Sequence, residues 1–144
     1  VATTLTGAGV DALMLASAPR NPSDSRGPWF DALLVDEATQ STEVSLLVAL
    51  QHCATLCILA GDHMQLPPTI ISQAAARSGL ATSLFERIAD AGDAPTRLLV
   101  QYRMHPRLSA YPSKRFYNGT LLDGVRASDR PMPVGFAWPR QGWP

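Results

Sequence analysis

The sequence predicts an α/β protein built on a parallel sheet, and three observations lead to this prediction. The segments Phe30–Val35 and Thr55–Ala60 are both largely apolar and short, which is typical of strands buried on both faces of a parallel sheet. Ser41–Gln51 lies between them and is apolar nearly all round, which is typical of a well-buried helix. A strand, a helix and a second strand of these lengths form a βαβ unit with parallel strands.

The chain before the first of these strands carries weaker signals. Val1–Leu5 is a short β-prone run, and Thr6–Gly9 is a turn-forming stretch. Val10–Ala16 fits a short helix or a second strand equally well. Ser17–Pro28 contains three prolines together with several small polar residues, so we expect a surface loop there.

Two helices and a third strand are expected after Ala60. Gln73–Ala76 and Leu80–Ala89 are helical stretches, and in the second Ser83 precedes Glu86 by three residues, which predicts a capping box if this helix begins late. Thr96–Val100 is the expected third buried strand.

A domain boundary is expected near Tyr102. From there proline becomes frequent, aromatic and basic residues alternate, and helical periodicity fades. We therefore expect one domain over 1–101 and the start of a second over 102–144. Phe116–Gly119 reads as a turn that follows a helix.

Composition narrows the class of protein. The chain has 144 residues, of which 46% are apolar, so a packed core is feasible and global disorder is excluded. The net charge is zero, but residues 1–96 carry four basic and ten acidic residues, whereas residues 97–144 carry eight basic and two acidic residues. The basic second part indicates either an anionic partner or a solvated basic face.

Cysteines and apolar runs indicate the cellular environment. Cys53 and Cys57 lie in an apolar segment, which favours buried thiols over a disulfide, and no second ligand pair at zinc spacing follows them. No leader pattern follows Val1, and no apolar run is long enough to cross a bilayer. We expect an intracellular segment of a longer protein, in the cytoplasm, the nucleus or both, with no membrane partner.

Each predicted strand ends in a polar cluster. These clusters are Asp36-Glu37, Gly61–Gln65 and Gln101–Arg103. Because the carboxyl ends of parallel strands share one edge of the sheet, we expect the three clusters to converge. Taken alone, Asp36 and Glu37 are also what a solvated acidic turn would contain.

The residue types in the clusters fit the hydrolysis of a nucleoside triphosphate. Asp36 would bind Mg²⁺, and Glu37 would position and polarise the attacking water. Gln65 carries an amide that can bind a γ-phosphate or the same water. Arg103 offers a planar fork for phosphate oxygens, and Tyr102 offers a face on which adenine can stack.

The same stretches resemble the motifs of superfamily 1 helicases. Val35–Gln40 resembles their Walker B motif, Gly61–Pro68 their motif III, and Gln101–Pro106, with its continuation to Gly119, their motif IV. Val1–Leu5 is similar to an earlier motif that contacts the nucleic-acid strand. The strongest resemblance is to group B, which includes the helicases of nonsense-mediated mRNA decay.

This resemblance implies a partial RecA-like P-loop NTPase sheet flanked by helices, followed by the start of a second RecA-like domain. The implied ligands are ATP, Mg²⁺, single-stranded RNA or DNA as the track, and the remainder of the chain's own helicase core. The implied roles, residue by residue, are catalysis for Glu37, Gln65 and Arg103, nucleotide binding for Asp36, Gln65, Tyr102 and Arg103, metal binding for Asp36 and Glu37, and nucleic-acid contact for Thr3, Thr4, Pro67 and Pro68.

The chain departs from the helicase pattern at one essential point. A P-loop needs a lysine after a glycine, but the single lysine, Lys114, follows Ser113. We therefore expect the phosphate-binding loop to lie upstream of Val1 and the isolated chain to hydrolyse no ATP. Two alternatives stay open: a degenerate, non-catalytic scaffold that binds nucleic acid or protein, and a P-loop ATPase that does not unwind.

Overall fold

The structure is a computed structural model that describes residues 1–10, 13, 30–131 and 135. The chain divides into two compact units, Val1–Ala94 and Pro95–Pro144, and each is described by itself. The expected boundary between residues 101 and 102 stays a prediction. The expectations for the stretch from Val10 to Pro28 fall almost entirely outside the described residues.

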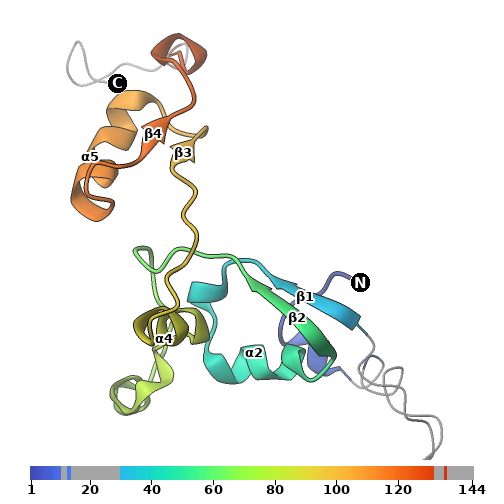
Figure 1. Ribbon diagram of the computed structural model, residues 1–144. Coiled ribbons are helices and arrows are strands. Elements are labelled where there is room, and N and C mark those ends of the chain that lie inside the picture. The colour runs from blue at the N-terminus through green and yellow to red at the C-terminus, as the bar shows by residue number, and fades with distance from the viewer. Residues whose placement is uncertain (11–12, 14–29, 132–134, 136–144) are drawn as a thin grey trace, which may run out of the picture. The chain divides into compact units, whose positions relative to one another are not determined.

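The first unit contains the predicted parallel strand pair (Figure 1). β1 (Phe30–Val35) pairs in parallel with β2 (Cys53–Leu59), with Val35 opposite Leu59. The helix α2 (Glu43–Leu50) connects them. The βαβ unit and the α/β class are therefore confirmed.

The helix α2 begins where the sequence provides a cap. The Thr42 side chain accepts a hydrogen bond from the Ser45 N–H at 3.2 Å, which satisfies one of the free N–H groups of the first turn. Burial differs from the expectation, because Leu46 and Ala49 are buried while Val44 and Leu47 are more than half exposed. The prediction of a helix buried all round is wrong, since only one stripe of α2 faces the core.

The strands are also less buried than expected, which corrects a second expectation, and in β2 the successive side chains of Leu56, Cys57 and Ile58 are all exposed. Val35 is buried, but Leu34 is 69% exposed and Leu56 is 51% exposed. Side chains alternate between the two faces of a sheet, and in the described residues a helical layer packs on one face. The core there comprises Val35, Ala38 and Leu46, packed against Leu5, Leu33, Leu50, Leu59, Leu84 and Phe85.

Three helical segments follow the loop after β2. α3 (Gln73–Ala75) continues into a π-type turn (Ala76–Leu80), and α4 (Leu84–Asp90) follows. The Ser83 side chain accepts from the Glu86 N–H at 3.1 Å, so the helix expected from Leu80 begins at Leu84, behind the cap that the sequence offered for a late start.

An exposed ion pair joins α4 to α2. The Arg87 guanidinium donates to both carboxylate oxygens of Glu43, at 2.9 and 2.6 Å. These hydrogen bonds hold the pKa of Glu43 below its usual value and raise the pKa of Arg87. The pair links two helices across 44 residues of sequence.

Two further expectations for the first unit are wrong. Val1–Leu5 forms no strand, and the chain instead turns into a 3-10 helix over Gly7–Gly9. Cys57 was expected to be buried, but its side chain is exposed on β2.

The second unit has its own small sheet (Figure 1). β3 (Val100–Gln101) pairs in parallel with β4 (Leu122–Asp123), and α5 (Pro106–Phe116) connects them. The expected buried strand over Thr96–Val100 is wrong in extent, in burial and in partner, because Leu98 is 91% exposed and the strand pairs with β4 in a sheet separate from β1 and β2.

The helix α5 lies where the sequence showed fading periodicity. Pro106 opens it, a position where a missing N–H costs nothing. After Phe116 the chain turns through Asn118 and Gly119, which have φ of 53° and 71°, and the Gly119 N–H donates to the Ser113 carbonyl at 2.9 Å. The predicted turn after a helix is confirmed.

Among the described residues, no helix has both the length and the apolar character needed to cross a bilayer.

Candidate functional site

The acidic pair lies at a point where β1 and β2 are tied together. The Ala60 N–H donates to the Val35 carbonyl, and the Ala38 N–H donates to the Ala60 carbonyl, both at 2.8 Å. Asp36 and Glu37 lie between these bonds and are exposed. The acidic pair is therefore carried on a backbone that is hydrogen-bonded on both sides.

Glu37 has an unusual backbone conformation. Its φ of 52° and ψ of 36° place it in the left-handed region, which costs a residue other than glycine about 1–2 kcal/mol. Strain of this kind concentrates at functional sites, because there it fixes the direction of a side chain. The conformation of Glu37 thus marks this turn as a candidate site.

Each carboxylate of the pair is held by one hydrogen bond. The Glu37 N–H donates to Asp36 Oδ1, and Gln40 Nε2 donates to Glu37 Oε2, both at 3.0 Å. Within the described part of the chain, the second oxygen of each carboxylate makes no hydrogen bond. Both acids are thus oriented and still able to bind a ligand.

The acidic pair fits a Mg²⁺ ion that is shared with a substrate. Mg²⁺ keeps several waters and takes one or two protein carboxylates together with substrate phosphates. No group of three or more His, Cys, Asp or Glu side chains that could hold a metal ion occurs among the described residues. Two adjacent carboxylates match the one or two protein ligands that such an ion takes.

The loop after β2 is fastened to the turn after β1 through Thr39. The Thr39 hydroxyl accepts from the Asp62 N–H and donates to the Asp62 carbonyl, both at 3.3 Å, and Thr39 is only 3% exposed. A Cβ on Gly61 would lie 3.1 Å from the Thr39 nitrogen and 3.2 Å from that of Ala38. Glycine therefore permits the close approach, and the first two polar clusters meet as expected.

Asp62 organises the loop that carries Gln65. One carboxylate oxygen of Asp62 accepts from the Met64 N–H at 3.0 Å, and the other accepts from Gln65 Nε2 at 2.9 Å. Gln65 is exposed. Its amide is therefore oriented by a neighbour in the same loop, while its oxygen makes no hydrogen bond within the described residues.

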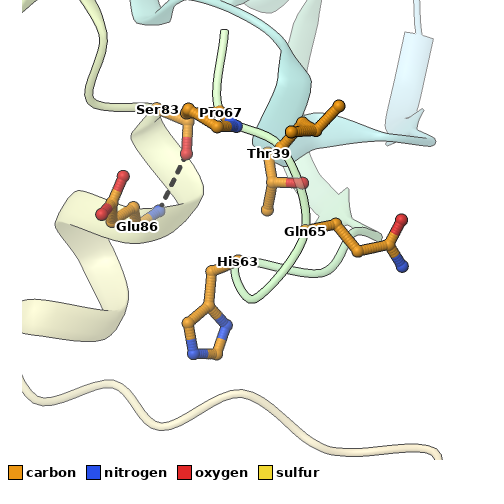
Figure 2. A pocket seen from close by; sticks show the side chains of 7 residues that line it. Thr39, His63, Gln65, Pro67, Ser83 and Glu86 are labelled. Carbon is orange, nitrogen blue, oxygen red and sulfur yellow. Dashed lines mark hydrogen bonds between the residues drawn. The ribbon is translucent and has the colours of Figure 1, made fainter. Parts of the chain in front are cut away.

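A cavity of about 170 Å³ lies beside this loop (Figure 2). The Gln65 side chain extends away from Ser83 and Glu86, and the ring of His63 stacks on that of Phe85 at 6.2 Å. The cavity is lined by Thr39, His63, Gln65, Leu66, Pro67, Ser83 and Glu86. The cavity lies between the Gln65 loop and the start of α4.

The third polar cluster belongs to the second unit. The Gln101 side chain accepts from the N–H groups of Arg103 and Met104 at 2.9 and 2.7 Å. Tyr102 is 64% exposed, and Arg103 is exposed with a guanidinium that makes no hydrogen bond or ion pair to any described residue. Because β3 lies in a separate sheet, the expectation that all three strands share one sheet edge is wrong for the third.

A carboxylate anchors this third cluster. Asp123 Oδ1 accepts from Ser109 Oγ and from Gln101 Nε2, both at 2.6 Å. These two hydrogen bonds, the one from Ser109 being the stronger cause, hold the pKa of Asp123 below its ordinary value. Asp123 therefore links α5 and β4 to the turn that carries Tyr102 and Arg103.

The residues expected to contact nucleic acid lie in the first unit. The Thr4 side chain accepts from the Gly7 N–H at 2.9 Å, and Thr3 and Thr4 are both exposed. Pro67 is exposed, whereas Pro68 is buried. Exposure leaves Thr3, Thr4 and Pro67 accessible to a ligand, and their contact with nucleic acid stays a prediction.

Sequence reasoning missed the residues that orient the expected ones. Gln40 and Asp62 belong to the motifs quoted above, but only their hydrogen bonds reveal what they hold. Thr39 gives a slightly better signal, because a threonine two residues after an exposed acidic pair needs a hydrogen-bond partner once it is buried.

Two family models, both described as AAA domain, match residues 1–73 and 80–144. The regulator of nonsense transcripts 1 homolog of Drosophila melanogaster is 50% identical over 111 residues, which are 77% of this chain and 9% of that protein. The homolog of Arabidopsis thaliana is 50% identical over 76% of this chain and 9% of its own length. An ATP-dependent helicase of Saccharomyces cerevisiae is 47% identical over 80% of this chain and 12% of its own length. The chain thus spans about a tenth of the length of these relatives.

Proposed function

Because this chain belongs to the AAA domain family and resembles the helicases of nonsense-mediated mRNA decay, we propose that it is part of the motor core of an ATP-dependent helicase. The parent protein would couple ATP hydrolysis to movement along single-stranded RNA or DNA and to unwinding. The supporting observation is the joined turn of the first unit, in which Thr39 holds the acidic pair after β1 against the Gln65 loop after β2.

Glu37 is the proposed catalytic base. Its left-handed backbone and the hydrogen bond from Gln40 fix its direction, and one carboxylate oxygen is left to accept a proton from water. General bases of this kind contribute a factor of about 10²–10⁴ to a rate. Asp36 is the proposed Mg²⁺ ligand, and the ion, when bound, would neutralise charge on the phosphates.

Gln65, Arg103 and Tyr102 are the proposed nucleotide contacts. The Gln65 amide would bind the γ-phosphate or the attacking water, and the Arg103 guanidinium would bind phosphate oxygens. Tyr102 would stack on the base. What supports these roles is that all three side chains are exposed and that the Arg103 guanidinium has no partner among the described residues.

The proposed track is single-stranded nucleic acid. Thr3, Thr4 and Pro67 are exposed and would face it from the first unit, next to the buried Pro68. The eight basic residues between positions 97 and 144 supply the charge that attracts phosphate. Binding to RNA or DNA would also need the rest of the helicase core.

The test is ATP hydrolysis by the full-length protein that contains this chain, with and without single-stranded RNA or DNA. We expect nucleic acid to stimulate turnover and Glu37→Gln to lower kcat by about 10²-fold or more while nucleotide still binds. Asp31→Asn is the matched control, because it removes an exposed carboxylate from the same strand without touching the turn.

Three outcomes would favour other functions. Binding of nucleic acid without turnover would favour the non-catalytic scaffold. Turnover without directional strand displacement would favour a P-loop ATPase that does not unwind. Turnover that is indifferent to Glu37→Gln would remove the proposed base. The isolated chain should hydrolyse no ATP, and a rate above background from pure residues 1–144 would contradict that part of the proposal.

A further inference from the structure

The backbone around Arg103 is held from one side by Arg130. Arg130 follows the 3-10 helix Ala127–Asp129. Its Nε donates to the Arg103 carbonyl at 3.0 Å, and its Nη2 donates to the Tyr102 carbonyl at 2.5 Å. The fork of one guanidinium therefore binds two successive carbonyl oxygens.

The Gln101 side chain binds the N–H groups of the same backbone segment. Its Oε1 accepts from the N–H of Arg103 at 2.9 Å and from the N–H of Met104 at 2.7 Å. The two peptide units that flank the Cα of Arg103 thus have all their polar groups bound, the carbonyls by Arg130 and the N–H groups by Gln101.

The backbone of Arg103 is fully hydrogen-bonded, but its side chain is not. The guanidinium of Arg103 makes no hydrogen bond or ion pair to any residue that the structure describes. A functional side chain is most effective when its backbone is ordered before the ligand arrives, because the cost of ordering is then not subtracted from binding. The arrangement orders the backbone and leaves the side chain available.

A role for Arg130 within its own 3-10 helix would explain only one of its three hydrogen bonds. Its Nη1 donates to the Asp129 carbonyl at 2.9 Å, which would suffice to close the 3-10 helix. The other two hydrogen bonds cross 27 and 28 residues to reach the Arg103 and Tyr102 carbonyls. Lysine could not make the same pair of contacts, since its ammonium is a single point of charge on a flexible stem.

We propose that Arg130 is a positioning residue for Arg103: its guanidinium fork fixes the peptide units that present the Arg103 side chain to the triphosphate. This inference rests on the proposed function of Arg103. Arg130 is not proposed to contact the nucleotide itself, because three of its five N–H donors are bound to backbone carbonyl oxygens.

The test measures ATP turnover by the full-length protein with saturating single-stranded nucleic acid. Arg130→Ala should lower kcat by about 10- to 100-fold with a smaller change in KM, because misplacement of a transition-state group by about 1 Å costs about that much. Arg130→Lys should recover only part of the loss. Arg97→Gln is the control, since it removes the same charge from an arginine of the same unit that lies over the Tyr117 ring.

A double-mutant cycle separates positioning from general stability. In an Arg103→Lys background, which retains the positive charge, Arg130→Ala should lower kcat much less than it does alone. Equal losses in the two backgrounds would overturn the inference. If Arg130→Ala fails to fold, Arg130→Lys takes its place in the same cycle.

The remaining outcomes distinguish the inference from the function on which it rests. If Arg103→Lys lowers kcat but Arg130→Ala behaves like Arg97→Gln, Arg130 does not position Arg103 and the proposed function stands. If Arg103→Lys leaves kcat unchanged, both the catalytic role of Arg103 and the positioning role of Arg130 are wrong.

Discussion

Thr39 and Asp62 exchange two hydrogen bonds, from the Asp62 N–H to Thr39 Oγ1 and from that hydroxyl to the Asp62 carbonyl, each 3.3 Å long. One side chain thereby satisfies both backbone groups of a residue in the other turn. Because Thr39 lies two residues after Glu37 and Asp62 orients Gln65, these bonds set how two of the proposed catalytic groups lie relative to each other.

Replacement of Thr39 by valine should loosen this junction without changing the size of the side chain. The Asp62 N–H and carbonyl would both lose the hydroxyl of a residue that is 3% exposed, while the carbonyl would keep the N–H of Gln65 at 3.1 Å. Loss of such a hydrogen bond costs about 0.5–1.5 kcal/mol of local stability. Amide hydrogen exchange in the full-length protein should accelerate over residues 61–66, and kcat should fall. Thr82→Val, at an exposed threonine, is the control, and equal exchange in the two variants would show that the junction does not depend on the hydroxyl.

Gln40 should matter for catalysis although it is not proposed to touch the nucleotide. Its amide donates to Glu37 Oε2 at 3.0 Å, so Gln40→Met removes the donor and keeps the length of the side chain. Loss of this orientation should lower kcat by about tenfold with little change in KM, since the carboxylate would sample directions unsuited to proton transfer. Gln51→Met serves as the comparison because Gln51 is an exposed glutamine bound only to the carbonyl of its own helix. A kcat for Gln40→Met equal to that of Gln51→Met would remove Gln40 from the site.

Ser109→Ala should change the dependence of stability on pH. The Ser109 hydroxyl is the main cause of the low pKa of Asp123, so the folded state holds this carboxylate ionised more strongly than the unfolded state does. Such a group adds stability above its unfolded pKa, near the ordinary value of 3.8, and this stability is lost as the pH falls through the lower folded pKa.

The corresponding measurement is thermal unfolding of the two proteins across acidic pH. Ser109→Ala should be the less stable protein at about pH 6, and the difference should shrink below about pH 4 as Asp123 is protonated. A difference that stays constant over this range would show that the hydroxyl acts through packing and not through the carboxylate.

The sequence predicted elements more reliably than it predicted their surroundings. Apolar runs with abrupt polar ends located β1, β2 and their parallel pairing, because those features are local. The prediction that both strands are buried was wrong at Leu34 and Leu56. An apolar side chain favours burial, but the local sequence does not show which element would pack against it. The late start of α4 was predictable from Ser83 and Glu86 because a helix cap depends only on residues within one turn.

The second unit was predicted less well for physical reasons of the same kind. The helix α5 contains Pro112 and several basic residues, which obscure its periodicity. The contact from Arg130 to the Tyr102 carbonyl spans 28 residues and leaves no local pattern to detect. The sequence accordingly singled out Asp36, Glu37 and Arg103 as candidate site residues, because their motifs are contiguous, and their roles stay predictions. It did not single out the residues that hold them.

Gly124 should control the position of Tyr102. A Cβ at Gly124 would lie 2.3 Å from the nearest ring atom of Tyr102, so Gly124→Ala must displace the ring, which is free to move because it is 64% exposed. If the ring stacks on the base, loss of part of about 1–3 kcal/mol of stacking should raise KM for ATP by up to about tenfold and change kcat less.

The comparison with Tyr102→Ala decides how such an effect arises. If Gly124→Ala acts only by moving the ring, it should have no further effect on KM once the ring is removed, because the added methyl group then meets no obstacle. A rise in KM from Gly124→Ala that persists in the Tyr102→Ala background would instead mean that the turn after β4 has shifted. Since that turn leads to Arg130, its displacement should lower kcat as well as raise KM. Displacement of the Tyr102 ring alone should raise KM and change kcat less, so the kinetics distinguish the two explanations.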